Sequence, residues 1–216
     1  MAMRYLVFAG LPILALMASG CTADLQETRC GAASSYVAHE LSNADGEKLV
    51  YGSDDDASTF DITWISEGKR AEMISSFVEE PWIDVRGRSI WQGADSNSIG
   101  KTTADSSLLR KLFETGKATN AVQQCPSVRK VLNDHRIDYG EGAVRAVSAI
   151  EDPNLGQHSK TIADVYLPIV SDDGQSAVLL VSRSWAPLAG AGVVVKIERQ
   201  DNGEWTPTRV QQIWVS

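Results

Sequence analysis

The last third of the chain has the clearest alternation of apolar and polar positions. Four runs rich in β-branched and aromatic residues predict strands at Ile162–Val170, Ala177–Trp185, Gly192–Arg199 and Trp205–Val215. An Asp-Gly dipeptide follows the first run and an Asn-Gly dipeptide follows the third. Both suit hairpin turns, because glycine accepts the positive φ that such turns require. We therefore expect an antiparallel β-meander.

The second of these runs is apolar on both sides. Every residue of Ala177–Val181 is apolar, as expected for a central strand whose two faces are both covered. Segments with helical spacing in the first half of the chain would supply the cover. They are Ser35–Leu41, Glu67–Glu79, a helix capped at Asp105 or Ser106 with Leu108, Leu109, Leu112 and Phe113 on its core face, and a helix that opens at Pro126.

Shorter strands are predicted at Lys48–Tyr51 and Phe60–Trp64, with two more within Trp82–Gln92. No internal repeat, Pro-rich linker or long block of like charge divides residues 30–216. The pattern predicts a single α+β domain in which the helices of the first half pack on a C-terminal antiparallel β-meander.

The first 20 residues are typical of a secretory signal peptide. Arg4 supplies a positive charge, and Tyr5–Met17 is an apolar stretch interrupted only by Gly10 and Pro12. A transmembrane helix needs about 20 apolar residues, and this stretch is shorter. We expect residues 1–20 to be removed from the mature protein.

The apolar stretch ends in Ala18-Ser19-Gly20-Cys21, which resembles the lipobox of bacterial lipoproteins. The resemblance implies cleavage before Cys21 and lipid on its sulfur and amino group. Thr22 stands where Asp commonly signals retention in the inner membrane, so the resemblance implies the periplasmic face of the outer membrane in a Gram-negative cell. The alternative is a soluble secreted protein in which Cys21 is an ordinary thiol.

Two further cysteines, Cys30 and Cys125, remain once Cys21 is assigned to lipid. An exported protein folds in an oxidising compartment, which favours a disulfide between them over two separate buried thiols. No C-x-x-C or nearby Cys/His spacing accompanies them, so we expect no metal site. Residues 21–29 would then form a lipidated tether of at most about 30 Å.

A second resemblance concerns topology alone. The order of Asp173-Gly174, the segment 188–192 (Leu-Ala-Gly-Ala-Gly) and Gly203-Glu204-Trp205 resembles the C-terminal hairpins of many uncharacterised secreted bacterial proteins. Those proteins bring no assigned activity.

Composition bounds the class of protein. The chain has 216 residues, of which 43% are hydrophobic and 22% charged, which is typical of a globular domain. Its formal charge is −8, and loss of Arg4 with the signal peptide makes the mature charge −9. Nucleic-acid binders need an excess of clustered Lys and Arg, so we expect no nucleic-acid partner.

Histidines are few: His39, His135 and His158. Asp134 and Asp138 lie near His135 in sequence, and this group could serve as the general base of a hydrolase. No G-x-S-x-G or similar nucleophile motif accompanies it. The structural interpretation, which we favour, places His135 at the C-terminal end of the Pro126 helix, where a cation interacts well with the helix dipole.

Two further segments have the residues of a ligand site but the wrong spacing. Asp54, Asp55 and Asp56 are consecutive, whereas a calcium loop needs ligands at alternate positions and a distal Glu. The glycines of segment 188–192 connect two predicted strands, so no helix N-terminus is available to bind phosphate. We expect the three aspartates to lie in a solvated loop. We expect the glycines to form a bulge or to permit a close backbone approach. Neither segment is expected to bind a cofactor.

Six tryptophans suggest either core packing or a stacking platform for glycans. Trp82, Trp91 and Trp185 are the candidates for an exposed binding surface. Three functions remain: a non-catalytic lipoprotein that binds a protein partner, such as an inhibitor or immunity protein; an envelope structural or glycan-binding module; and a hydrolase centred on His135. We favour the first, because permanent anchoring, acidic charge and the lack of a catalytic motif all agree with it.

Overall fold

The computed structural model describes residues 18–43, 49–52, 59–61, 102–115, 117–148, 151–152, 157–158, 160–186 and 189–215. The predicted helix Glu67–Glu79 and the predicted strands within Trp82–Gln92 lie outside these residues, as do the three consecutive aspartates.

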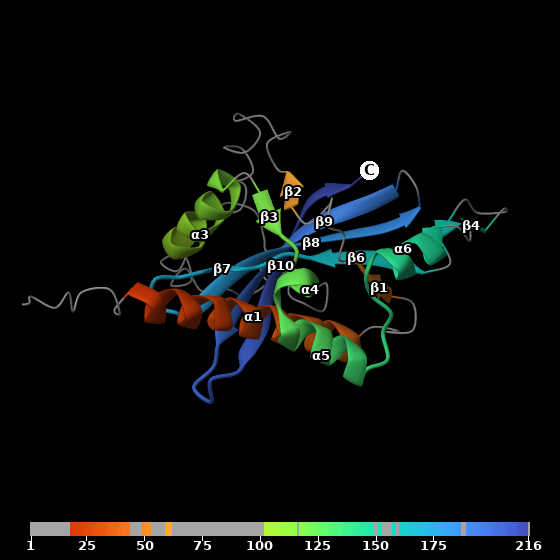
Figure 1. Ribbon diagram of the computed structural model, residues 1–216. Helices are drawn as coiled ribbons and strands as arrows, with labels where there is room; N and C mark the ends of the chain where they lie inside the picture. Colours follow the sequence, from red (N-terminus) through yellow and green to blue (C-terminus); the bar gives the residue numbers. More distant parts are fainter. Residues whose placement is uncertain are drawn as a thin grey trace, which may run out of the picture.

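A mixed β-sheet forms the centre of the domain (Figure 1). Its strands are β1 (Leu49–Tyr51), β6 (Thr161–Val165), β7 (Ile169–Val170), β8 (Ser176–Ala186), β9 (Ala189–Arg199) and β10 (Trp205–Val215). The order is β1-β6-β8-β9-β10, and β7 also pairs with β8. β8, β9 and β10 pair antiparallel in succession, which confirms the predicted meander, whereas β1 pairs parallel with β6.

The first predicted strand, Ile162–Val170, is divided in the structure. β6 ends at Val165 and β7 begins at Ile169. Pro168 in the interval has no N–H to donate to a neighbouring strand. The backbone N–H of Leu167 instead donates to the carbonyl of Thr119, at 2.7 Å. The N–H of Tyr166 still donates to the carbonyl of Leu180 on β8, so the polypeptide leaves the sheet only at Leu167 and Pro168 and rejoins it at β7.

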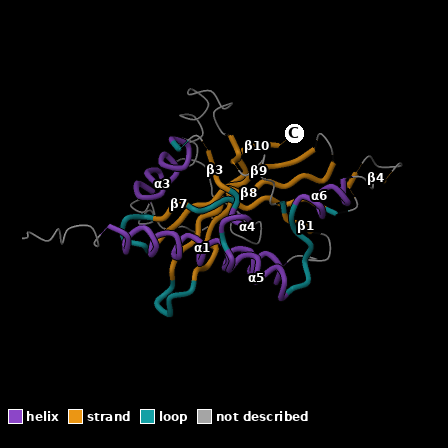
Figure 2. Tube along the Cα trace, viewed as in Figure 1, coloured by secondary structure: helices purple, strands orange, loops and turns teal. Residues whose placement is uncertain are grey.

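Helices cover both faces of the sheet, as Figures 1 and 2 show. They are α1 (Ala18–Asn43), α3 (Thr102–Glu114), α4 (Ala121–Gln124), α5 (Pro126–Asp134) and α6 (Glu141–Ser148). Two short pairs of strands complete the described elements: β2 (Thr59–Asp61) with β3 (Lys117–Thr119), and β4 (Glu151–Asp152) with β5 (Gln157–His158).

Strand β8 divides the hydrophobic core into two. Ala177, Leu179 and Val181 pack with α1, α4 and α5, while Val178 and Leu180 pack with α3. All five side chains are buried. The prediction of a central strand covered by helices from the first half is therefore confirmed, and the fold is α+β.

Two helices begin earlier than predicted. Helix α1 extends over Ala18–Asn43 instead of Ser35–Leu41, because the buried stripe through Val37 and Ala33 continues back to Cys30. Residues 21–29 are therefore helical, and position 21 is about 14 Å from Cys30 along the helix axis. Helix α3 begins at Thr102, so the predicted caps Asp105 and Ser106 lie within it, while its predicted core face is buried.

Candidate functional site

Helix α1 connects Cys21 with the core of the domain. Its first turns include Cys21, for which the sequence predicts lipidation, and the same helix supplies Cys30 to the core. None of the helices in the described part of the chain is long and apolar enough to cross a membrane.

Cys30 and Cys125 have the geometry that a disulfide requires. Their Cα atoms are 5.3 Å apart and their sulfur atoms 2.09 Å apart, within bonding distance. Cys125 is fully buried between α4 and α5. The structure is thus compatible with the predicted disulfide, which ties α1 to the α4–α5 junction.

A buried polar cluster lies between α1 and the sheet, and the sequence analysis missed it. Glu40 on α1 is 7% exposed. Its carboxylate accepts a 2.5 Å hydrogen bond from the Tyr51 hydroxyl. The same carboxylate forms an ion pair with the guanidinium of Arg183 on β8. The buried side chain of Tyr36 lies beside both charged groups, which act on its pKa. The four side chains join α1, β1 and β8.

The two tyrosines of this cluster are held in the neutral form. Burial and the neighbouring Glu40 carboxylate raise the pKa of Tyr51 far above its ordinary value, and the same causes raise the pKa of Tyr36. Both phenols are therefore hydrogen-bond donors at any physiological pH. Arg183 is half-exposed, but its Nε is buried and has no hydrogen-bond partner among the described residues.

A second polar group lies on the opposite face of the sheet. Asp164 of β6 pairs with Ser182 of β8, whose hydroxyl donates to the carboxylate at 3.2 Å. The carboxylate approaches the backbone of Gly52 so closely that a Cβ at position 52 would collide with it. Burial and the Asp164 charge raise the pKa of the adjacent Tyr166 well above its ordinary value.

Spacing in the sequence offered a signal for the first cluster. Glu40 is four residues after Tyr36 and one before Leu41, so it falls on the apolar side of the predicted helix. Arg183 continues the alternation of Leu179 and Val181 on strand β8. A carboxylate and a guanidinium at core positions predict a buried ion pair, although their mutual contact required the fold.

His135 lies where the structural interpretation placed it. It is exposed and is the C-terminal cap of α5, with its backbone N–H donating to the carbonyl of Val131. The carboxylate of Asp134 pairs with Lys130 at 2.6 Å, and that of Asp138 pairs with Lys160 at 3.3 Å. Both carboxylates that the hydrolase hypothesis assigned to His135 are thus bound to lysines.

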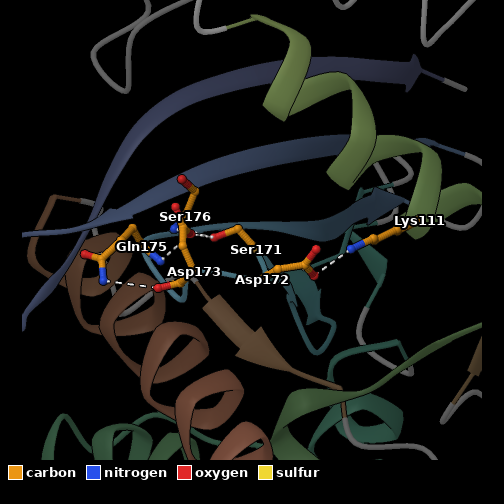
Figure 3. A network of polar contacts seen from close by, with 6 residues as sticks. All are labelled: Lys111, Ser171, Asp172, Asp173, Gln175 and Ser176. Carbon is orange, nitrogen blue, oxygen red and sulfur yellow. Dashed lines mark hydrogen bonds and ion pairs between the residues drawn. The ribbon is translucent and has the colours of Figure 1, made fainter.

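The Asp172-Asp173-Gly174 segment forms the turn between β7 and β8 (Figure 3). Asp173 accepts hydrogen bonds from the Ser171 hydroxyl at 2.5 Å and from the Gln175 N–H at 3.0 Å. These bonds lower the pKa of its carboxyl group. Asp172 pairs with Lys111 of α3 at 2.9 Å. The Asp173 carboxylate therefore stabilises the turn, and the Asp172 carboxylate holds α3 against it.

The β9–β10 turn is beside the β7–β8 turn, because the N–H of Arg199 donates to the carbonyl of Gln175. Asp201 and Glu204 of this turn are exposed. Neither makes an ion pair within the described residues. One end of the sheet is therefore acidic.

Of the three candidate tryptophans, Trp82 and Trp91 lie outside the described residues, and Trp185 is half-buried near the end of β8. The pairing of β8 with β9 shifts register between Ser184 and Ala186, so Trp185 occupies a bulge. The opposing residues include Gly190 and Gly192. A bulge is thus present at this end of the sheet, but on β8; residues 189–192, which were predicted to connect two strands, belong to β9.

In the described part of the chain, no group of three or more His, Cys, Asp or Glu side chains is placed to hold a metal ion. Comparison with protein-family models, with curated proteins and with solved structures found no significant match. Any function must therefore be argued from the chain's own residues.

Proposed function

We propose that the protein is an envelope lipoprotein, anchored through lipid on Cys21, whose domain binds a protein partner with a cationic surface. The observation that carries the proposal is the position of Cys21 in helix α1. The same helix is tied to the core nine residues later by the Cys30–Cys125 pair. A lipid at this position would hold the whole domain close to the membrane.

Anchoring by this lipid would be permanent. Each buried CH₂ group contributes about 0.8 kcal/mol, and a lipoprotein cysteine carries several acyl chains, whereas one chain is already marginally sufficient. Thr22 after the cysteine favours the outer membrane in a Gram-negative cell. The protein would face the periplasm, where a disulfide is stable.

The charge of the domain favours a cationic partner. The mature chain has a formal charge of −9, and the adjacent β7–β8 and β9–β10 turns carry four carboxylates, of which only Asp172 is in an ion pair among the described residues. Complementary charge accelerates association and excludes partners of like charge. An inhibitor or immunity protein that captures a basic protein near the membrane would use such a surface.

Fractionation of cells that express the Cys21→Ser variant tests the anchor. We expect the wild type in the membrane fraction and the variant in the soluble fraction. The matched control is Thr22→Ser, which keeps the cysteine and should remain with the membrane. A Cys21→Ser protein that still fractionates with membranes would contradict lipid anchoring.

Cross-linking followed by purification from detergent-solubilised membranes tests the partner. We expect a basic protein to be recovered when the cross-linker is added at low salt. Less of it should be recovered when the cross-linker is added at 0.5 M salt, because salt screens the exposed charges that hold the two proteins together before cross-linking. Recovery of no protein after cross-linking, under conditions where the lipoprotein itself is recovered, would count against partner binding.

A further inference from the structure

The β9–β10 turn contains the only Asn-Gly dipeptide of the sequence, Asn202-Gly203. Residues 201–204 are all exposed, so the turn is accessible to water. Gly203 has a φ of 84°, a conformation that glycine adopts without strain. Its N–H donates to the carbonyl of Gln200 at 2.8 Å, and the amide oxygen of Asn202 accepts from the N–H of Glu204 at 3.0 Å.

The β7–β8 turn has the same construction with an aspartate in place of the asparagine. Gly174 has a φ of 69°, and its N–H donates to the carbonyl three residues earlier, that of Ser171. The Asp173 carboxylate accepts from the N–H two residues later at 3.0 Å, as Asn202 does in its own turn. A carboxylate therefore fits this position of the turn.

We propose that Asn202 is a deamidation site, at which the folded protein acquires an additional carboxylate. The backbone nitrogen of Gly203 attacks the side-chain amide carbon of Asn202. The new C–N bond closes a succinimide ring, the C–N bond to Nδ2 breaks, and the amide proton of Gly203 leaves with Nδ2 as ammonia. Water then opens the ring at either carbonyl, which restores the Gly203 N–H and leaves an aspartate or an isoaspartate.

The glycine makes this asparagine more reactive than others in the described part of the chain. Gly203 has no Cβ to obstruct the approach of its nitrogen to the amide carbon. Asn133, in contrast, is followed by Asp134. The Gly203 hydrogen bond to Gln200 must open before the ring can close, but an exposed turn opens locally at far lower free energy than the whole fold.

The new carboxylate would change the β9–β10 turn. Nδ2 of Asn202 donates to the Glu204 carboxylate at 2.7 Å. An aspartate lacks this donor, so two negative charges would face each other and repel. An isoaspartate lengthens the backbone and disrupts the hydrogen bonds of the turn. Either product adds negative charge to the acidic end of the sheet and, if the proposed function holds, increases the attraction of a cationic partner.

Peptide mapping by mass spectrometry tests the site. The purified, folded protein is incubated at mildly alkaline pH and digested, and the conversion of each asparagine is followed with time. The control within the same sample is Asn133, which is also exposed and lies in α5. We expect conversion at Asn202 to be at least about tenfold faster, because only Asn202 of the two precedes a glycine. Equal rates at the two positions would overturn the proposal.

The Gly203→Asn variant separates the effect of the glycine from that of exposure. Asparagine tolerates positive φ better than most residues that have a Cβ, so the turn should be kept while the nitrogen becomes hindered. We expect the conversion rate at position 202 to fall at least about tenfold. An unchanged rate would overturn the proposal. Neither measurement involves the lipid or the partner, so failure of the proposed function would leave this result standing.

Discussion

Tyr36 and Tyr51 show how a buried carboxylate changes the behaviour of its neighbours. In the folded protein, burial and Glu40 hold the pKa of both phenols far above the ordinary value, while in the unfolded chain each ionises at about pH 10. Above that pH the unfolded chain has lost protons that the folded chain retains. Since stability falls with pH wherever the unfolded state binds fewer protons, alkaline pH should destabilise the fold.

We expect the free energy of unfolding to decrease above about pH 10, by up to about 1.4 kcal/mol per pH unit for each buried tyrosine. The stabilisation is fully present below that pH. Tyr51→Phe should reduce the slope, and the exposed-site control Glu27→Gln should leave it unchanged. Urea titrations between pH 8 and pH 11 measure it. A slope that is the same in Tyr51→Phe would contradict the proposed role of burial.

Position 52 must be occupied by a residue that has no side chain. A Cβ there would collide with the Asp164 carboxylate, which the Ser182 hydroxyl also binds. We expect Gly52→Ala to destabilise the protein by about 1–3 kcal/mol, because an overpacked site must shift. The loss should be smaller when Asp164→Ala is already present. Thermal or urea unfolding measures both.

Gly142 supplies the matched control. It lies in helix α6, and nothing is within 4 Å of the Cβ that would be added. Gly142→Ala should stabilise the protein by about 0.4–1 kcal/mol, because alanine loses less backbone entropy on folding. Equal effects at the two glycines would show that the Asp164 contact is not responsible.

The sequence therefore indicates which polar residues lie at core positions, but not which of them contact each other. The spacing of Glu40 on its helix and of Arg183 on its strand was visible in the sequence. Their meeting was not, because residues 143 positions apart in the chain come together only through the packing of α1 on β8. The close approach of the Asp164 carboxylate to Gly52 likewise depends on the parallel pairing of β1 with β6.

At the scale of elements, strand periodicity proved the stronger signal. The last three strands of the meander and the central position of β8 follow from alternation, from Asn-Gly and from an apolar run. The start of α1 does not follow, because its N-terminal turns lie beyond the packed stripe and include the polar residues Asp24, Gln26 and Glu27. The short helices α4 and α6 bury only a few residues each, so their patterns are weak.

The covalent tie between α1 and the α4–α5 junction should contribute much of the stability of this arrangement. The two cysteines are 95 residues apart in sequence. Closing a loop of that length stabilises a fold by about 4–5 kcal/mol in the chain-entropy model, as an upper figure. We expect the Cys30→Ala/Cys125→Ala variant to lose up to this free energy of unfolding, as measured by urea titration.

Reduction provides the control for the disulfide. The wild type should lose a similar stability in the presence of a strong reductant, while the double variant should not respond to it. A wild type whose unfolding midpoint is indifferent to reductant would show that the two thiols are not bonded.

For the whole molecule, the distribution of charge connects the fold to the proposed partner. The acidic end consists of the adjacent β7–β8 and β9–β10 turns. We expect the Asp201→Lys/Glu204→Lys variant to associate with a cationic partner at least about tenfold more slowly at low salt, because steering depends on local charge. Stopped-flow mixing with the partner recovered by cross-linking measures the rate.

A variant with the same change of net charge separates local from overall charge. Asp134→Lys/Glu141→Lys reverses two exposed carboxylates that are already paired with Lys130 and Arg145. It should slow association less than the change at the β9–β10 turn. Equal slowing by the two variants would indicate that only the net charge matters.

The central claim is that Cys21 becomes the lipidated first residue of the mature protein. Mass spectrometry of the N-terminal peptide, isolated from the membrane fraction, tests it most directly. We predict a peptide that begins at Cys21 and carries a diacylglyceryl group on sulfur and an acyl chain on its amino group. A peptide with an unmodified Cys21, or one that begins at another residue, would contradict the account.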